Sequence, residues 1–308
     1  MSVLAGRAAL VTGGGRGVGR AIVEALHAAG ASLVVADNGT SIGGSGADPS
    51  VAQAVAKALG DRVTAYTESI ASPSAARAAV ELALRRFGGL DIVVNAAAIL
   101  RDGFIFKAEA ENWDAVLRTN LSAAFHVLAA ATPVMREQAK ANRGGSPYAW
   151  GRVVNIVSTA GLYGNYGQAA YASAKAGLVG LTRVVALDMA RSGVTANAVA
   201  PFAATRVTET IKPANPAQAT YRERALKVPA RAVGELVAWL AGPEAKDVTG
   251  QVFGVRGREI FLFSQPRPVA RLVNPGAAGL GAAIASALKP HYIGPETDLE
   301  AFSSEPLT

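Results

Sequence analysis

A run of glycines near the amino terminus constrains the fold of this chain more than any other feature. The segment Thr12-Gly13-Gly14-Gly15-Arg16-Gly17-Val18-Gly19 joins the apolar run 8–12 to residues 18–29, where apolar side chains recur at helical spacing. This order predicts a strand, a tight turn and a helix. Glycines in such a turn let the backbone approach a pyrophosphate at the helix amino terminus, although a simple tight turn needs glycines too. The segment therefore predicts an α/β unit whose first turn is open to an anion.

The same strand and helix pattern recurs along the chain. Apolar runs predict strands at residues 8–12, 32–36, 62–66, 91–94, 152–157, 194–199 and 251–255. Segments of helical spacing lie between them, at residues 18–29, 49–59, 73–87, 113–140, 171–190 and 232–240. Strands that alternate with helices favour a parallel sheet covered by helices on both faces. We therefore predict the α/β class, with a doubly wound parallel sheet of the Rossmann type.

Two segments depart from this pattern. Residues 38–50 (NGTSIGGSGADPS) are polar and rich in glycine, which predicts a flexible loop beside the first turn. From residue 257 onward the chain has proline-rich turns and one alanine-rich helical segment at 277–289, which is typical of an appendage rather than a second core. We therefore expect a single dinucleotide-binding domain over residues 1–256, which includes the catalytic site, and a C-terminal extension over residues 257–308.

Composition argues against several classes of function. The 308 residues include no cysteine, which excludes disulfides and thiolate chemistry, and the three histidines are scattered, so we expect no metal site. No uninterrupted apolar run reaches 18 residues and residues 1–7 lack the core of a signal peptide, so we expect a soluble, cytoplasmic protein without membrane contact. The net charge of +7 comes from dispersed Lys and Arg residues, which favours steering of an anionic small molecule over binding of nucleic acid.

An acidic residue ends the second predicted strand. Asp37 follows Gly13 by 24 positions, where a carboxylate can accept hydrogen bonds from both ribose hydroxyls of NAD. The same carboxylate repels the 2′-phosphate of NADP, although Arg16 within the glycine turn would attract that phosphate. The alternative is that Asp37 only forms the turn before Asn38-Gly39. We expect NAD rather than NADP to be the cofactor.

A tyrosine and a lysine occupy one face of a predicted helix. Tyr171 and Lys175 are four residues apart, and Ser158 follows the predicted strand 152–157. In α/β sheets, binding sites form where strands end at the carboxyl edge. A serine, a tyrosine and a lysine at that edge can polarise a carbonyl, donate a proton and lower the pKa of the donor. These residues predict hydride transfer between a dinucleotide and a secondary alcohol or ketone.

These motifs resemble those of the short-chain dehydrogenase/reductase family, in the family's order over residues 6–255. The matching positions are TGGGRGVG at 12–19, Asp37, Asn95-Ala96-Ala97-Ala98, Asn120, Ser158, Tyr171 and Lys175. The resemblance implies that Ser158 binds the substrate oxygen and that Tyr171 transfers the proton. It also implies that Lys175 holds the nicotinamide ribose and tunes Tyr171, and that Asn120 holds a water between Lys175 and solvent. Family members assemble into dimers or tetramers, so the resemblance implies a homo-oligomer.

The resemblance also implies which residues contact the cofactor, with the carboxamide expected at Phe202 and Thr205. The full expected set is Gly13, Gly15, Arg16, Gly17, Val18, Gly19, Asp37, Ser69, Ile70, Asn95, Ala97, Tyr171, Lys175, Phe202 and Thr205. The chain departs from the family twice on the adenosine side. The usual Asn-Asn-Ala-Gly is Asn95-Ala96-Ala97-Ala98 here, and Glu68 stands where the family generally has aspartate.

Finer features resemble the (3R)-hydroxyacyl-CoA dehydrogenase modules of peroxisomal multifunctional enzymes and their stand-alone bacterial relatives. These features are the insert 38–50, the segments 99–102, 162–168 and 201–208, and the C-terminal extension. They imply that the substrate is an acyl-CoA and that the reaction interconverts 3-hydroxyacyl-CoA and 3-oxoacyl-CoA. An alternative is a ketone reductase or a hydroxysteroid or alcohol dehydrogenase of the same family. A catalytically inactive, dinucleotide-binding regulator is a further alternative, although the chain retains both the tyrosine and the lysine.

Four arginines precede the tail, namely Arg256, Arg258, Arg267 and Arg271. Glu259 is their only acidic neighbour, and such a group is typical of a solvated face. The alternative is a contact with the phosphates of CoA.

Overall fold

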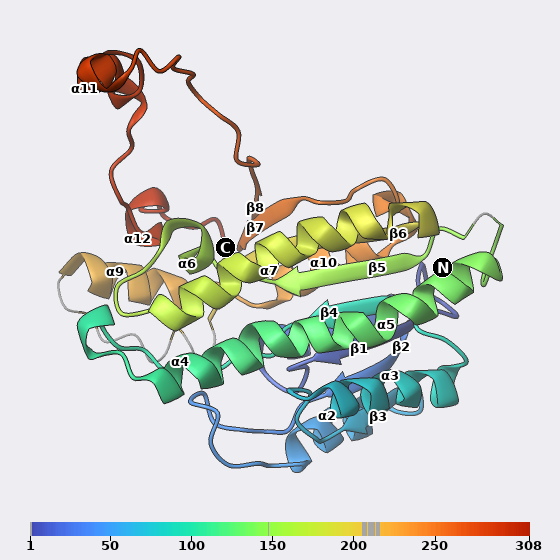
Figure 1. Cartoon of the computed structure of the whole chain (residues 1–308). Helices are drawn as coiled ribbons and strands as arrows, with labels where there is room; N and C mark the ends of the chain where they lie inside the picture. The colour runs from blue at the N-terminus through green and yellow to red at the C-terminus, as the bar shows by residue number, and fades with distance from the viewer. Residues whose placement is uncertain (1, 147, 205–207, 209–212, 214–215) are drawn as a thin grey trace.

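An eight-stranded sheet forms the centre of the computed structural model, which describes residues 2–146, 148–204, 208, 213 and 216–308 (Figure 1). Its strands are β1 (Ala8–Thr12), β2 (Ser32–Ala36), β3 (Val63–Tyr66), β4 (Ile92–Asn95), β5 (Gly151–Ile156), β6 (Val194–Phe202), β7 (Val252–Arg256) and β8 (Glu259–Phe263). They lie in the order β3-β2-β1-β4-β5-β6-β7-β8. All neighbouring strands are parallel except β7 and β8. The predicted Rossmann-type doubly wound sheet is confirmed.

Helices cover both faces of the sheet. The α-helices are α1 (Gly17–Ala28), α2 (Ser50–Leu59), α3 (Pro73–Phe87), α4 (Ala110–Leu117), α5 (Ala123–Lys140), α6 (Ala160–Tyr163), α7 (Ala169–Asp188), α9 (Pro216–Ala225), α10 (Arg231–Ala241), α11 (Ala277–Ala287) and α12 (Asp298–Ala301). Side chains of α1, α2 and α10 form one buried core with the sheet, and α3, α5 and α7 form another on the opposite face. Within the described ranges, no helix combines the length and hydrophobicity needed to cross a bilayer.

The strand order places a crevice next to the glycine turn. From β1 the chain runs outward to β2 and β3, then returns to β4 on the other side of β1. The connections that leave β1 and β4 therefore diverge at the carboxyl edge, where doubly wound sheets bind their ligands. The residues that end β1 and β4, Thr12 and Asn95, lie side by side in the register of the sheet.

Two elements differ from the sequence prediction. The predicted helix 113–140 is divided into α4 and α5 by a π-helical turn at Arg118–Ser122. The strand predicted at 251–255 is not the last one, because β8 (Glu259–Phe263) pairs with β7 across the turn at Gly257, where φ is +60°. The sheet therefore continues beyond residue 256. Sequence analysis did not predict β8, because the strand is short and a proline-rich segment follows it.

The rest of the C-terminal extension leaves the body and returns to it. Helix α11 buries none of its residues and projects away from the sheet (Figure 1). Phe302 then packs against Phe202 at a centroid distance of 4.7 Å and also contacts Phe261 and Phe263. The prediction that Arg256 lies on a solvated face is wrong. Only 5% of this residue is exposed, and it forms an ion pair with Glu259 at 2.7 Å. Its guanidinium also donates to the carbonyls of Phe302 and Ser304, so it anchors the returning segment.

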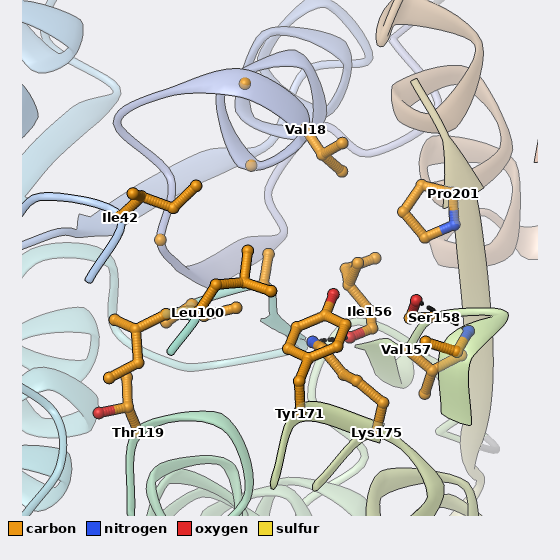
Figure 2. A pocket seen from close by; sticks show the side chains of 18 of the residues that line it. Val18, Ile42, Leu100, Thr119, Ile156, Val157, Ser158, Tyr171, Lys175 and Pro201 are labelled. Carbon is orange, nitrogen blue, oxygen red and sulfur yellow. Dashed lines mark hydrogen bonds between the residues drawn. The ribbon is translucent and has the colours of Figure 1, made fainter. Parts of the chain in front are cut away.

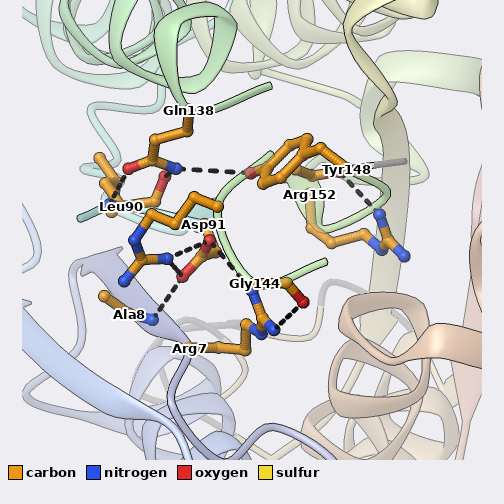
Figure 3. Close-up of polar contacts among 10 residues, drawn as sticks. Arg7, Ala8, Leu90, Asp91, Gln138, Gly144, Tyr148 and Arg152 are labelled. Carbon is orange, nitrogen blue, oxygen red and sulfur yellow. Dashed lines mark hydrogen bonds and ion pairs between the residues drawn. The ribbon is translucent and has the colours of Figure 1, made fainter. Parts of the chain in front are cut away.

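A buried polar network holds the amino edge of the sheet, opposite the crevice (Figure 3). Asp91, which is fully buried, accepts hydrogen bonds from Arg143 at 2.6 Å and from the amide of Ala8 at 2.9 Å, and Arg7 lies 3.8 Å away. Gln138 bonds both the amide and the carbonyl of Leu90. A carboxylate that is buried away from water must be paired in this way, because an unpaired buried charge strongly destabilises a fold. The network fixes the starts of β1 and β4 and serves structure rather than a ligand.

Candidate active site

The glycine turn between β1 and α1 brings two backbones into close contact. Gly13 has φ of +66°, and a Cβ atom there would lie 2.7 Å from Cα of Ala97, in the segment after β4. A Cβ at Gly19 would lie 2.0 Å from the carbonyl oxygen of Gly13. No side chain fits at either position, so the backbone at Gly13 and Gly19 is left uncovered. Such a cradle fits the pyrophosphate of a dinucleotide.

Asp37 lies at the end of β2 beside this turn and is held by the backbone. Its Oδ2 accepts a hydrogen bond from the amide of Gly15 at 2.9 Å, and its Oδ1 accepts one from the amide of Gly39 at 2.8 Å. Asp37 therefore forms the turn before Gly39 and also lines the cleft. The guanidinium of Arg16 donates to the carbonyls of Gly39 and Thr40 at 3.3 Å, which places a cation on the same loop.

A single large cleft of about 760 Å³ runs along the carboxyl edge of the sheet and unites most of the predicted site (Figure 2). This volume is within the range of ligand-binding clefts. The predicted residues that line it are Gly13, Arg16, Gly17, Val18, Gly19, Asp37, Ser69, Ile70, Ala97, Ser158, Tyr171, Lys175 and Phe202. The loop 38–50 also reaches the cleft, as predicted, and is tied to the opposite side by a hydrogen bond from the amide of Leu100 to the carbonyl of Ile42.

Three predicted residues do not line the cleft, and one lies outside the described residues. Asn95 faces the neighbouring strand instead, where its amide donates to Oδ1 of Asn155 at 2.8 Å. Gly15 lies behind the turn against Asp37, and Asn120 is buried. Only the amide nitrogen of Asn95 is paired, because its Oδ1 is buried without a hydrogen-bond partner among the described residues. Thr205 belongs to the part of the chain that the structure does not describe.

Ser158, Tyr171 and Lys175 converge in the cleft (Figure 2). Ser158 follows the end of β5, and the other two residues are one turn apart on α7, as the spacing predicted. Nζ of Lys175 is buried below Tyr171, donates to the carbonyl of Ile156 at 2.7 Å and lies 5.7 Å from the centre of the Tyr171 ring. The helix thus carries a phenol at the cleft surface with an amine behind it.

Burial acts on the titration of both groups. It raises the pKa of Tyr171 to about 12, while a hydrogen bond from Ser158 acts in the opposite direction. Burial also lowers the pKa of Lys175 to about 8. Both groups lose the water that would solvate their charged forms, so each favours its neutral form more than it would in solution. An ammonium at 5.7 Å from the centre of the phenol ring would favour the phenolate.

Asn120 lies in the π-helical turn between α4 and α5. Its Oδ1 accepts from the amide of Ile99 at 2.8 Å and its Nδ2 donates to the carbonyl of Ile99 at 2.9 Å. The side chain therefore fastens the segment after β4 to the helix that packs beside α7. A water at this position would be held by the backbone of the turn, because a π-helical turn displaces backbone groups from the regular helical hydrogen bonds.

Sequence analysis noted segments 99–102 and 162–168 only as a resemblance, and it assigned to the site none of the residues that form the outer wall of the cleft. They are Asp102, Asn165 and Gln168, with Tyr221 of α9 and with Thr297, Asp298 and Glu300 of the C-terminal extension. Thr297 and Glu300 form a capping box, a pattern that could have located the start of α12. No local pattern indicates that α12 folds back onto the segment after β5, where Thr159 donates to Asp298 at 2.7 Å.

Comparisons with known proteins agree with this geometry. A family model described as short chain dehydrogenase matches residues 7–218. A crystal structure of a short chain dehydrogenase from Mycobacterium avium superposes with a TM-score of 0.78 at 34% sequence identity, covering 96% of this chain and 98% of that one. This confirms the family resemblance inferred from the sequence motifs.

Three curated relatives extend the comparison. A short-chain type dehydrogenase/reductase of Mycobacterium tuberculosis is 41% identical over 181 residues, which are 59% of this chain but only 57% of that protein. The hydroxyacyl-CoA dehydrogenase ChsB1 of the same organism is 38% identical over 71% of this chain and 68% of its own length. A 3-oxoacyl-(acyl-carrier-protein) reductase of Vibrio cholerae is 37% identical over 82% of this chain and 97% of its own length. The chain belongs to the short chain dehydrogenase family and is an oxidoreductase that acts on CH–OH groups.

Proposed function

We propose that this protein reversibly oxidises a 3-hydroxyacyl thioester, foremost a 3-hydroxyacyl-CoA, with NAD. One observation carries the proposed chemistry: Ser158, Tyr171 and Lys175 meet in the same cleft as a glycine turn shaped for a dinucleotide. The relatives support the substrate class, because one is named a hydroxyacyl-CoA dehydrogenase and another a 3-oxoacyl-(acyl-carrier-protein) reductase. Both names denote acyl thioesters, which differ in the carrier.

The proposed roles follow from the position of each side chain. Ser158 would hold the substrate oxygen, and the phenol of Tyr171 would accept the hydroxyl proton during oxidation and return it during reduction. The ammonium form of Lys175 would favour the phenolate and so oppose the burial that raises the pKa of Tyr171. The backbone at Asn120 would hold a water between Lys175 and solvent. A bound NAD supplies the acceptor for the hydride.

The charge of Asp37 supports NAD as the cofactor. We expect wild-type protein to use NAD with a higher kcat/KM than NADP, and Asp37→Asn to lower the NAD to NADP ratio about a hundredfold. Asparagine retains a carbonyl that can accept from an amide but removes the charge that repels a 2′-phosphate, and Arg16 nearby can then contact that phosphate. Steady-state kinetics with both dinucleotides measure the ratio, and Asp61→Asn, at an exposed position outside the cleft, is the control. A wild type that prefers NADP would contradict the assignment.

The proposed substrate is tested by a panel of secondary alcohols with NAD. We expect a 3-hydroxyacyl-CoA to be oxidised with a kcat/KM roughly a hundredfold or more above that of the free 3-hydroxy acid or a simple secondary alcohol. The remote carrier contributes binding energy that can be used at the reacting carbon. The net charge of +7 attracts the anionic carrier, so added salt should raise KM for the thioester more than for an uncharged substrate. Equal rates for a neutral steroid or small alcohol, without salt dependence for the thioester, would favour the alcohol dehydrogenase alternative.

A further inference from the structure

The end of the C-terminal extension forms part of the cleft wall. Helix α12 (Asp298–Ala301) begins with the capping box of Thr297 and Glu300 and lies beside α6 in Figure 1. Thr297, Asp298 and Glu300 all line the cleft. The aromatic contacts of Phe302 and the hydrogen bonds from Arg256 to the carbonyls of Phe302 and Ser304 hold the segment that follows. An acidic helix turn is thus fixed at the substrate side of the site.

Asp298 is held by two hydroxyl donors. Oδ2 accepts from Oγ1 of Thr159 at 2.7 Å and from the phenol of Tyr221 at 3.3 Å. Thr159 is 3% exposed and directly follows Ser158 in the chain, so its bond ties Asp298 to the same segment after β5 that carries Ser158 into the cleft. Burial, together with the Asp298 carboxylate, raises the pKa of Tyr221, so the phenol remains a donor. The carboxylate therefore has a defined position rather than a free side chain in solvent.

The charge at this position acts on the reacting centre. Burial is the largest cause of the raised pKa of Tyr171, and the carboxylates of Asp102 and Asp298 add to it. Asp102 is held by the side-chain amide of Gln168 at 3.0 Å. The cations among the described lining residues are Arg16, at the dinucleotide end, and Lys175, which lies behind Tyr171. Negative charge therefore faces the substrate from the outer wall of the described cleft.

We propose that Asp298 is a specificity-determining residue that excludes substrates carrying a carboxylate next to the reacting carbinol. In a free 3-hydroxy acid the carboxylate is two bonds from the reacting carbon, whereas the corresponding thioester has a neutral carbonyl there. Like charges a few ångströms apart in a partly hydrated cleft repel by on the order of a kcal/mol or more. Asp298 thus selects the neutral acyl derivative, and this inference rests on the proposed function for its substrate class.

The experiment compares Asp298→Asn with wild type on a matched pair of substrates, 3-hydroxybutanoate and its methyl ester. Asparagine keeps the size of the side chain and a carbonyl that can accept from Thr159 and Tyr221, but removes the charge. We expect the ratio of kcat/KM for the ester to that for the acid to fall about tenfold in the variant. Glu296→Gln removes the same charge from an exposed position two residues earlier, outside the cleft, and should leave the ratio as in wild type.

A second measurement separates the charge of Asp298 from its role as an anchor. Among the described residues, the carboxylates of Asp102 and Asp298 raise the pKa of Tyr171, and Nζ of Lys175 lies 5.7 Å from the centre of its ring. We expect loss of the Asp298 carboxylate to lower the pKa of the phenol. The pH at which oxidation becomes half-maximal should therefore move downward in Asp298→Asn. An unchanged substrate ratio and pH profile, with Asp298→Ala lowering activity on both substrates equally, would reduce Asp298 to an anchor and overturn the proposal. Neither 3-hydroxybutanoate nor its methyl ester carries CoA, so their comparison tests Asp298 independently of the carrier. If wild type shows no preference for CoA thioesters, only the proposed function is overturned.

Discussion

Replacing Tyr171 with phenylalanine is expected to lower kcat by roughly a thousandfold or more while the dissociation constant for NAD changes by less than about threefold. Proton transfer by a positioned side chain contributes about 10² to 10⁴ to the rate of an enzymatic reaction. The substitution removes one hydroxyl and leaves the ring, whose packing against Ile99 and Val116 supports the cleft. The glycine turn and Asp37, which are proposed to bind the dinucleotide, lie on other elements and are untouched. Turnover is followed by NADH formation and binding by titration calorimetry.

The control for this variant is Tyr292→Phe, which removes the same hydroxyl from a side chain that is 66% exposed and outside the cleft. It should retain wild-type rates. Substantial turnover in Tyr171→Phe would show that another group transfers the proton, because phenylalanine has no titratable atom. Loss of dinucleotide binding together with turnover would instead show that Tyr171 supports the cofactor site.

Replacing Lys175 with methionine is expected to lower kcat/KM about a hundredfold, to weaken dinucleotide binding and to move the pH dependence of oxidation upward. Methionine keeps the length of the side chain but not its charge. Burial lowers the pKa of Lys175 to about 8, so below that pH its ammonium is present and favours the phenolate of Tyr171. Without the ammonium the pKa of the phenol rises further, and oxidation requires more alkaline solution.

The pH profile of kcat/KM for Lys175→Met and wild type measures this effect. Lys57→Met, at an exposed position on α2, is the control for loss of a lysine charge elsewhere. A variant with an altered thermal midpoint but an unchanged pH profile and unchanged NAD affinity would identify Lys175 as a structural residue. The bond from Nζ to the carbonyl of Ile156 would then be its whole contribution.

The features that sequence predicts well are those set by neighbours along the chain. Helix α3 begins and ends where expected, because Ser72 caps its first turn, Pro73 occupies the first position and Gly88 ends it with φ of +69°. The convergence of Ser158 with Tyr171 and Lys175 was also predictable, because a strand end and a helical spacing of four define it. Local chemistry thus determines both the framework and the centre of the cleft.

The features that sequence analysis missed depend on contacts between distant residues. Arg256 reads as a surface cation until Glu259 and the carbonyls of Phe302 and Ser304 surround it. Thr159 and Asp298 are 139 positions apart, and neither carries a local signal of their hydrogen bond. Asn95 faces Asn155 rather than the cleft because the register of β4 against β5 brings the two amides together. Such contacts are decided by packing, so the outer wall of the site could not be read from periodicity or motifs.

The most direct test of the central proposal is product analysis of wild-type protein with NAD and a 3-hydroxyacyl-CoA. The proposal predicts NADH and 3-oxoacyl-CoA in equal amounts, with one proton released for each. At a concentration of NAD that saturates Tyr171→Phe, this variant should form both products roughly a thousandfold or more slowly. Absence of both products in wild type at saturating NAD, or their formation at undiminished rate by the variant, would contradict the assignment of this cleft.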